Sequence, residues 1–535
     1  MITRRQLLQT VGVSWFADQA LPDRPNITGR IVGTSCPVGH QLGRVTSQAQ
    51  APPERAEVVI VGSGVSGLSA AWRLNHAGIA PLILELEPRV GGTSAWGTEG
   101  VVPHPWGAHY LPVPERGART TRRLLAELGI MTGTDAAGRP LFDEELLCHA
   151  PEQRLWFRGG WHEGLVPYGA LSTHERSEMD RFQAIQHDLQ SAKGSDGRDL
   201  FAIPCEQSST DPAALELDRM SMAEWLRRQH FESAFLRWYV EYGTRDDFGA
   251  ELDDVSAWAA LHYFGARKLH TEQLQGSRYL VWPEGLGGPV GQLFAKLEGE
   301  VVSGALVTTV APLPKGGVEV VYLDVARRRW VRVHARAAIV ATPAFITRRL
   351  LAGSLRSAAA ALPRRTSSPW IVANVHVRRP PGPNQAWDTM IYDSVGLGYV
   401  DASHQLTTLG DETVLTYYRS YGSRQVAKAR AGLRHASWAT LASEVLDDLS
   451  LAHAEIVQQC SRVDVMIWAH GMPRPRPGFL GATPLQSPAA PDRHVAWAHV
   501  DQTGFAIFEE ANLHGVRAAE HIAVGLGAHR GESWL

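Results

Sequence analysis

The clearest pattern of apolar and polar positions lies between residues 56 and 85. A β-branched apolar run at 58–61 predicts a buried strand, and the glycine-rich turn after it leads into a helical stretch that ends around 75–78. A second apolar run at 81–84 predicts another strand, which ends in Glu85. This order of strand, glycine turn, helix, strand and acid is typical of a dinucleotide-binding βαβ unit.

Two other patterns mark the middle of the chain. Apolar residues recur at spacings of three and four in 118–130 and 221–242, which predicts helices. Apolar and polar residues alternate in 371–377 and 412–421, which predicts antiparallel strands. Together these segments predict a mixed sheet beneath a helical cap.

The glycines of the first turn suit a diphosphate. Gly62 permits the tight turn, Gly64 lets the backbone approach a pyrophosphate, and Gly67 lets the helix pack closely on the strand. The N-terminus of the helix offers N–H groups and a partial positive charge to the phosphates. Glu85 follows Gly67 by 18 positions, near the spacing at which a carboxylate binds ribose hydroxyls. The segment therefore predicts dinucleotide binding.

Composition narrows the functional class. The chain has 535 residues, and 52 basic against 55 acidic side chains give a formal net charge of −3. This near-neutral balance offers no electrostatic footprint for nucleic acid, and the sequence contains no apolar run of the roughly 18 residues that a membrane span needs. The four cysteines are too far apart for the paired spacing of a zinc site, so we expect no metal site. At this chain length we expect free thiols rather than a disulfide scaffold, with one disulfide pair as the alternative for an exported protein. A small-molecule substrate is the expected partner.

Further motifs accompany the first turn. Arg89, Gly91 and Gly92 form an R-x-G-G arrangement, which offers a cation and a second close backbone approach to the same diphosphate. Ala341 opens an A-T-P turn at the end of an apolar strand. Near the C-terminus, another apolar strand leads to Asp501, and a helical stretch with a G-x-x-A-A pattern follows.

These motifs, in this order, resemble the flavin amine oxidase and phytoene desaturase superfamily. The resemblance spans residues 56–525 and implies an α/β fold with a Rossmann-like FAD-binding domain, with FAD rather than NAD as the cofactor. It implies that the strand 301–307 holds the adenine edge through its backbone, and that Asp501 reaches the ribityl or phosphate region. The implied cofactor-binding residues are Gly62, Ser63, Gly64, Val65, Ser66, Gly67, Glu85, Leu86, Arg89, Gly91, Gly92, Gly107, Ala108, Val307, Ala341 and Asp501.

The wide spacing of the motifs implies a discontinuous cofactor domain. We expect it to be assembled from 56–115, 285–350 and 455–525. The substrate and cap domain then comprises 116–284 and 351–454. Residues 21–55 are rich in Pro, Gly, Ser and Gln, so we expect a linker or extended arm there, with the compact fold beginning near Ala56.

The resemblance also implies candidate catalytic residues. Residues 107–110 match a segment that passes over the flavin face, which places His109 near the reacting atoms. Trp468 lies on a strand that runs toward the substrate cavity, where it could form one wall of an aromatic cage for a cationic amine. Asn374 matches a position at which many amine oxidases carry a lysine that holds a water near flavin N5. Asparagine can orient a water but supplies no charge.

Two other features bear on the site. The run 238–247 combines aromatic residues with opposed charges, which favours the salt-bridged end of a cap helix over a lining of the substrate entrance. Thr93 stands where many relatives of the family have a further arginine, so one phosphate contact is absent or comes from elsewhere.

From these features we expect an FAD-dependent oxidoreductase of the amine oxidase type. It would take a hydride from a small or polyamine-type substrate, with reoxidation by oxygen. Three alternatives stay open. The first is a desaturase or isomerase of an isoprenoid or fatty chain, which needs a long apolar tunnel. The second is a redox-inactive flavin-binding assembly protein, and the third is an NAD-dependent dehydrogenase.

The N-terminus carries a possible export signal. Arg4 and Arg5 precede a short apolar stretch at 7–17, a pattern similar to a twin-arginine signal over residues 1–20. The alternative is a disordered basic tail on a cytoplasmic protein. Because twin-arginine pathways move folded proteins, the signal suits a protein whose cofactor is inserted before export. We therefore expect a periplasmic or otherwise exported protein.

Overall fold

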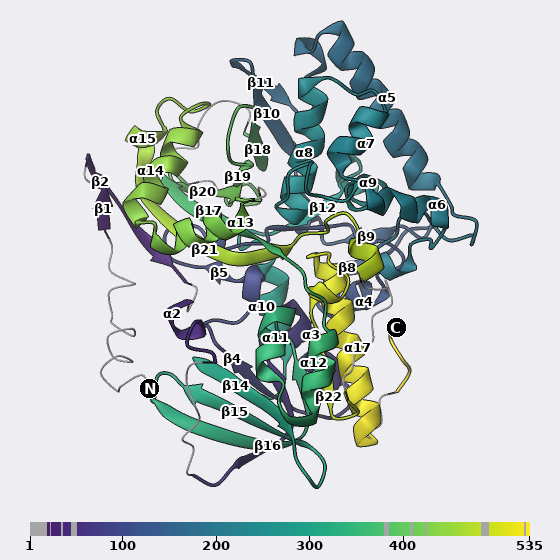
Figure 1. Ribbon diagram of the computed structural model, residues 1–535. Helices are drawn as coiled ribbons and strands as arrows, with labels where there is room; N and C mark the ends of the chain where they lie inside the picture. The colour runs from purple at the N-terminus through teal and green to yellow at the C-terminus, as the bar shows by residue number, and fades with distance from the viewer. Residues whose placement is uncertain are drawn as a thin grey trace.

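Two large sheets organise the chain (Figure 1). A computed structural model describes residues 19–21, 23–33, 36–43, 51–378, 385–406, 410–422, 425–482, 492–528 and 531–535. One sheet has seven strands and the other nine, and helices pack on both. The α/β fold, with a Rossmann-like domain beside a mixed sheet and a helical cap, is as predicted. No helix in these ranges is both long and apolar enough to cross a membrane.

The seven-stranded sheet forms the predicted cofactor domain. Its order is β13-β4-β3-β16-β15-β14, with β22 pairing β16. The strands are β3 (Glu54–Val61), β4 (Leu82–Glu85), β13 (Glu300–Ser303), β14 (Ala305–Pro312), β15 (Val318–Asp324), β16 (Arg329–Val340) and β22 (Val495–Trp497). The helices packed on this domain are α3 (Val65–Asn75), α4 (Arg119–Glu127), α10 (Gly287–Lys296), α11 (Ala344–Leu350), α12 (Arg356–Ala361) and α17 (Phe508–Leu526).

The nine-stranded sheet is mixed and has the order β1-β2-β21-β17-β20-β19-β18-β10-β11. Its strands are β1 (Gln19–Leu21), β2 (Arg24–Val32), β10 (Gln153–Phe157), β11 (Gly160–Glu163), β17 (Ser367–Val377), β18 (Asp388–Ile391), β19 (Gly398–Asp401), β20 (Thr413–Ser420) and β21 (Cys460–Pro473). The alternating segments predicted as antiparallel strands are β17 and β20, which pair with each other.

Helices cover this second sheet in two groups (Figure 1). One group comprises α13 (Val426–His435), α14 (Trp438–Leu449) and α15 (Ile456–Gln459). The other is the cap, which comprises α5 (Thr173–Ser191), α6 (Pro212–Leu215), α7 (Met222–Arg228), α8 (Ala234–Phe248) and α9 (Ala257–Gly265). The remaining elements are short: α2 (Cys36–Gly39), α16 (Phe479–Ala482), β5 (Trp96–Gly97), β6 (His104–Pro105), β7 (Tyr110–Pro112), β8 (Met131–Thr134), β9 (Pro140–Phe142) and β12 (Tyr279–Val281).

The structure corrects three boundaries. Within the stretch 21–55 that we expected to be a linker or arm, Arg24–Val32 forms β2, which joins the nine-stranded sheet through parallel pairing with β21. Strand β1 (Gln19–Leu21), at the end of the expected signal 1–20, pairs with β2. Strand β21 lies in that same sheet, so 460–473 belongs to the substrate domain rather than to the cofactor domain. The expected single strand 301–307 is broken at Gly304, whose φ of +71° separates β13 from β14.

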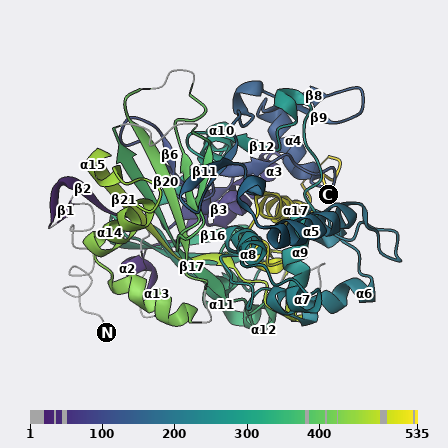
Figure 2. The ribbon, with the colours of Figure 1, turned by 90° about the horizontal axis from the view of Figure 1, so that it is seen from above.

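Glycines bring α3 and α17 into close contact. A Cβ on Gly515 would lie 2.2 Å from the carbonyl oxygen of Ser66 and 2.8 Å from Cβ of Ser69, so no side chain fits between the helices there. Figure 2 shows the two helices side by side, although their sequences lie more than 400 positions apart. Helix α17, in the last piece of the cofactor domain, thus contacts α3, in the first piece, at a glycine that has no side chain.

We expect Gly515→Ala to destabilise the cofactor domain. The added methyl group must push α17 away from α3, and overpacking of this kind costs about 1–3 kcal/mol. Thermal unfolding measures the effect. Gly432→Ala is the matched control, since Gly432 lies in α13 with nothing within 4 Å of its Cβ position. Equal melting temperatures for the two variants would contradict the close-contact argument.

Candidate functional site

The first glycine turn has the shape that a diphosphate needs. Gly62 has a φ of +99°, and a Cβ there would lie 2.7 Å from the carbonyl oxygen of Ala341. A Cβ on Gly67 would lie 2.0 Å from the carbonyl oxygen of Gly62. Helix α3 starts at Val65, so its N-terminal N–H groups face the turn. The backbone here can approach a bound pyrophosphate without side chains in the way, and the residues present fit the predicted dinucleotide.

Glu85 is held in place at the end of β4. Its Oε2 accepts hydrogen bonds from the backbone N–H of Ser63 at 2.8 Å and from Ser63 Oγ at 2.5 Å. Its Oε1 accepts one from the N–H of Glu87 at 2.8 Å. Because a carboxylate oxygen has more than one acceptor site, Oε1 can still receive a ribose hydroxyl. Leu86 follows directly and is half-buried.

The R-x-G-G segment lies against the first turn. The N–H of Gly91 donates to the carbonyl oxygen of Ser63 at 2.9 Å, and Gly91 also bridges to Gly64. The side chain of Arg89 is half exposed, and it donates to the carbonyl oxygen of Trp96 and to Glu99. Two glycine turns from one region of sequence therefore form one cradle, as the resemblance implies.

The A-T-P turn and the closing motif also meet. The N–H of Ala341 donates to the carbonyl oxygen of Val61 at 2.8 Å. Asp501 is buried, and its Oδ2 accepts from the N–H of Ala344 at 2.8 Å, just beyond that turn. Val307 lies buried in β14, paired with Tyr322. The structure thus brings Asp501 to the A-T-P turn, while its contact with the cofactor stays a prediction.

A cavity lies where the cofactor domain meets the nine-stranded sheet and the cap. It is lined by the 107–110 segment, by β17, β20 and β21 of the sheet, by the end of α8, and by the start of α17. The lining residues are Thr93, Gly107, Ala108, His109, Tyr110, Leu111, Pro112, Asp246, Asp247, Arg267, Leu286, Trp370, Val372, Tyr418, Trp468, Gly471, Met472, Ala506, Ile507, Phe508 and Glu509.

Aromatic rings form much of the cavity wall. The ring centroid of His109 lies 4.4 Å from that of Tyr418 and 4.9 Å from that of Tyr110. The indole N–H of Trp468 donates to the carbonyl oxygen of Trp106 at 2.6 Å, which fixes this ring. Burial lowers the pKa of His109 to about 3, so this imidazole is neutral at pH 7. His109 and Trp468 thus lie together at the cavity, although sequence analysis did not identify Tyr418 or Trp370.

Acidic groups gather on one side of the cavity. Asp246 accepts a hydrogen bond from Tyr110 Oη at 3.1 Å, and burial, with the charge of Asp247, raises its pKa to about 7. Asp247 and Glu509 also have raised pKa values because they are buried, and Arg267 lies between them at 3.6 and 3.9 Å. The cavity wall therefore contains three carboxyl groups and one guanidinium group, besides the neutral imidazole of His109.

The end of α8 thus differs from our expectation. The run 238–247 was expected to end as a salt-bridged cap helix, but only Asp247 has a basic partner in the cavity wall, whereas Asp246 hydrogen-bonds a tyrosine. Sequence spacing could not show this, because it does not reveal that Tyr110 of β7 bonds Asp246 or that Arg245 bonds Ser420 of β20.

Asn374 also differs from our expectation. It is fully buried in β17 and does not line the cavity, whereas Trp370 and Val372 of the same strand do. Its Nδ2 donates to the carbonyl oxygen of Pro105 at 3.0 Å, and its Oδ1 accepts from Thr416 Oγ1 at 2.7 Å. Because both ends of the amide bond the protein, the structure does not place Asn374 as a water-orienting group in the cavity.

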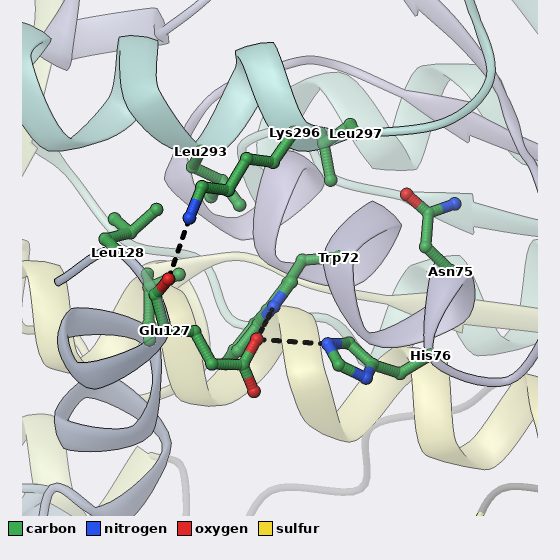
Figure 3. Close-up of a pocket in the computed structure, with 9 residues that line it drawn as sticks. Trp72, Asn75, His76, Glu127, Leu128, Leu293, Lys296 and Leu297 are labelled. Atoms are coloured by element: carbon green, nitrogen blue, oxygen red, sulfur yellow. Dashed lines mark hydrogen bonds and ion pairs between the residues drawn. The ribbon is translucent and has the colours of Figure 1, made fainter.

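A second hollow lies on the outer side of the cofactor domain, between α3, α4 and α10 (Figure 3). Glu127 there accepts from Trp72 Nε1 at 2.9 Å and lies 3.0 Å from His76 Nε2, and Lys296 donates to the carbonyl oxygen of Glu127. Trp72, His76, Glu127 and Lys296 therefore bond one another, and Asn75 bonds Ile79 and Glu298. None of the predicted site residues lines this hollow, and it shares no residue with the cavity.

The sequence model of the family described as "Flavin containing amine oxidoreductase" matches residues 65–523. A protein of Mycobacterium tuberculosis with the provisional name flavin-containing monoamine oxidase AofH is 31% identical over 228 residues. That match covers 42% of this chain and 43% of AofH, so the chain spans less than half the length of this curated relative.

Solved structures share the fold. Putrescine oxidase bound to putrescine has a TM-score of 0.64 at 17% identity, over 88% of this chain and 100% of that one. Cyclohexylamine oxidase from Brevibacterium oxydans has a TM-score of 0.60 at 17% identity, over 88% and 99%. A fatty acid isomerase from P. acnes has a TM-score of 0.56 at 15% identity, over 86% and 97%. At these identities the likeness concerns the fold alone.

The acids give a prediction for stability against pH. Asp388 lies behind the cavity, accepts from Tyr242 Oη and Gln153 Nε2, and has a pKa raised to about 7 by burial and by the charge of Asp246. Between about pH 4 and pH 7, the carboxyl group of Asp388 stays protonated in the folded chain, although the same group in the unfolded chain has already lost its proton. The free energy of unfolding therefore falls as pH rises from about 4 through 7.

We expect Asp388→Asn to remove this loss, because its amide oxygen can keep the acceptor role. The difference in free energy of unfolding between the variant and wild type should shift in favour of the variant, by on the order of 2 kcal/mol, as pH rises from 5 to 8. Denaturant unfolding at both pH values measures it. The exposed Asp393 provides the control Asp393→Asn, which should show no such gain. A variant that loses stability equally at both pH values would contradict the assignment.

Proposed function

Because the chain belongs to the flavin-containing amine oxidoreductase family, with FAD as its cofactor, we propose that it is an FAD-dependent oxidase of a small cationic amine. The reaction would oxidise the C–N bond to an imine, with transfer of two electrons and reduction of oxygen to hydrogen peroxide. When bound, FAD accepts the hydride from the substrate carbon. The residues of the glycine cradle would hold its diphosphate, and Glu85 its ribose.

The composition of the cavity wall carries this proposal. An ammonium group inside a buried cavity needs negative partners, because burial of an unpaired charge is costly. Asp246, Asp247 and Glu509 supply acids to the wall, and only Arg267 opposes them. The faces of Tyr418 and Trp468 add cation–π attraction, which strengthens when the cation is desolvated.

Named residues can take distinct roles in this reaction. Asp246 is the acid whose ionised form binds the ammonium group, and with a pKa near 7 it can also take up the proton that the amine must lose. Tyr110 orients that carboxyl group. Neutral His109, Tyr418 and Trp468 exclude water and hold the substrate carbon in position.

The alternative of a desaturase or isomerase of a fatty or isoprenoid chain is less well supported. Such a substrate needs an apolar tunnel, whereas Asp246, which forms no ion pair within this wall, would lose hydration beside an uncharged chain. The shared fold of the fatty acid isomerase does not bear on this choice.

We expect anaerobic addition of an amine to bleach the bound flavin. Benzylamine, putrescine and spermidine form the test panel, with linoleic acid as the probe for the alternative, and visible absorbance is the measurement. The variant Asp246→Asn should lower kcat/KM for the best amine at least tenfold, because it removes a charge from the amine site. The control Asp393→Asn should leave kcat/KM unchanged.

Three outcomes would overturn this function. Bleaching by linoleic acid and by no amine would favour the alternative. A flavin that no compound of the panel reduces would favour the redox-inactive assembly protein, and a colourless protein that binds NADH would favour the dehydrogenase.

We also propose that the protein is exported. The support is Arg4 and Arg5 before the apolar stretch 7–17, a region that lies outside the described residues. Replacing both arginines by lysine should move the protein from the periplasmic to the cytoplasmic fraction of a host with a twin-arginine pathway. Arg55→Lys, outside the signal, is the control. Unchanged fractionation of the double variant would contradict export.

A further inference from the structure

We infer that Asn374 is a positioning residue, which fixes the backbone strip 105–108 between the cofactor cradle and the substrate sheet. This inference rests on the proposed function for its kinetic consequence, but its geometry is independent of any substrate. The strip runs directly into the cavity segment 107–110. Its position therefore sets where Gly107, Ala108, His109 and Tyr110 lie.

Three consecutive carbonyl groups of the strip each accept one side-chain hydrogen bond. The carbonyl oxygen of Pro105 accepts from Asn374 Nδ2 at 3.0 Å, that of Trp106 from Trp468 Nε1 at 2.6 Å, and that of Gly107 from Tyr418 Oη at 2.9 Å. We call these three donors the carbonyl clamp. They come from β17, β21 and β20, which are neighbours in the nine-stranded sheet.

The opposite edge of the strip is bonded to the cofactor domain. The N–H of Trp106 donates to the carbonyl oxygen of Ala95, and that of Ala108 donates to the carbonyl oxygen of Thr93, both at 2.9 Å. Thr93 and Ala95 directly follow the R-x-G-G segment. The N–H groups of the strip thus donate toward the cradle, and its carbonyl groups accept from the sheet. These backbone hydrogen bonds set the distance between the cradle and the nine-stranded sheet.

Asn374 is suited to this task by having a donor and an acceptor in one amide. Thr416 Oγ1, on the neighbouring strand, donates to Asn374 Oδ1 at 2.7 Å and so directs Nδ2 toward Pro105. Both residues are fully buried, where an unpaired amide or carbonyl has no water to replace its partner. Neither residue lines the cavity, which separates them from the two clamp donors that do.

The role predicts an effect on catalysis that burial alone would not produce. Small shifts of groups beside the reacting atoms lower rates steeply, because the substrate loses its reactive alignment. Loss of the Asn374 bond should therefore slow flavin reduction at saturating substrate more than it raises KM. It should also change the visible circular dichroism of the bound flavin, because that signal depends on the arrangement of the protein groups around the flavin.

Thr416→Val and Thr416→Ser make the sharpest test. Valine keeps the shape of threonine without the donor, and serine keeps the donor without the methyl group. We expect Thr416→Val and Asn374→Leu to retain FAD, to change the visible circular dichroism of the flavin, and to lower the limiting rate of anaerobic reduction at least fivefold. Thr416→Ser should keep the wild-type spectrum and remain within twofold of the wild-type rate.

The inference is overturned if Thr416→Val matches Thr416→Ser in both the flavin dichroism and the limiting rate. It is also overturned if Thr416→Val lowers only the melting temperature, which is the result expected of a merely structural bond. Should Asn374→Leu fail to fold, the threonine pair still decides. If wild-type protein is reduced by no amine, the proposed function fails, and the dichroism of the threonine variants tests the clamp without a substrate.

Discussion

Backbone contact without intervening side chains is the constraint on which the cofactor domain depends. Gly62 meets Ala341, Gly67 meets Gly62, and Gly515 meets Ser66 at distances that leave no room for a Cβ. The contact between Gly67 and Gly62 lies within one βαβ unit. The other two contacts join segments that are far apart in sequence. Because these contacts place α3, β16 and α17 around one glycine turn, the diphosphate cradle exists only when all the pieces are docked.

The second domain is attached to this cradle through the strip 105–108. Hydrogen bonds run from the strip to both sides, so the cradle and the nine-stranded sheet share one continuous network of backbone and side-chain bonds. The same strands that hold the strip provide Trp370, Tyr418 and Trp468 to the cavity wall. A cavity built this way is rigid where the substrate carbon must be aligned, which is the usual requirement for a preorganised site.

The buried acids give the cavity its chemical character. Asp246 and Asp388 lie in surroundings rich in tyrosine, where burial disfavours their ionised forms. The charge of Asp246 raises the pKa of Asp388, and both charges raise the pKa of Tyr242. Such groups lower stability at neutral pH, and strongly shifted acids of this kind are concentrated at functional sites. Under the proposed function, a cationic substrate would relieve this cost at Asp246, which lines the cavity, whereas Asp388 does not line it and bears on stability.

Local sequence determined the parts of this protein whose requirements lie within a few residues. The glycine turn at Gly62 and the acid at Glu85 follow from backbone conformation and strand–helix periodicity, and they predicted a dinucleotide-binding unit. The resemblance of the ordered motifs to a known superfamily then predicted the fold, the cofactor and the family. Tertiary structure alone decided that β2 pairs with a strand more than 400 residues away, that Asp246 faces a cavity, and that Asn374 bonds the protein rather than a water. Those outcomes depend on which surfaces become buried against each other. The spacing of residues along the sequence does not show which distant surfaces pack together.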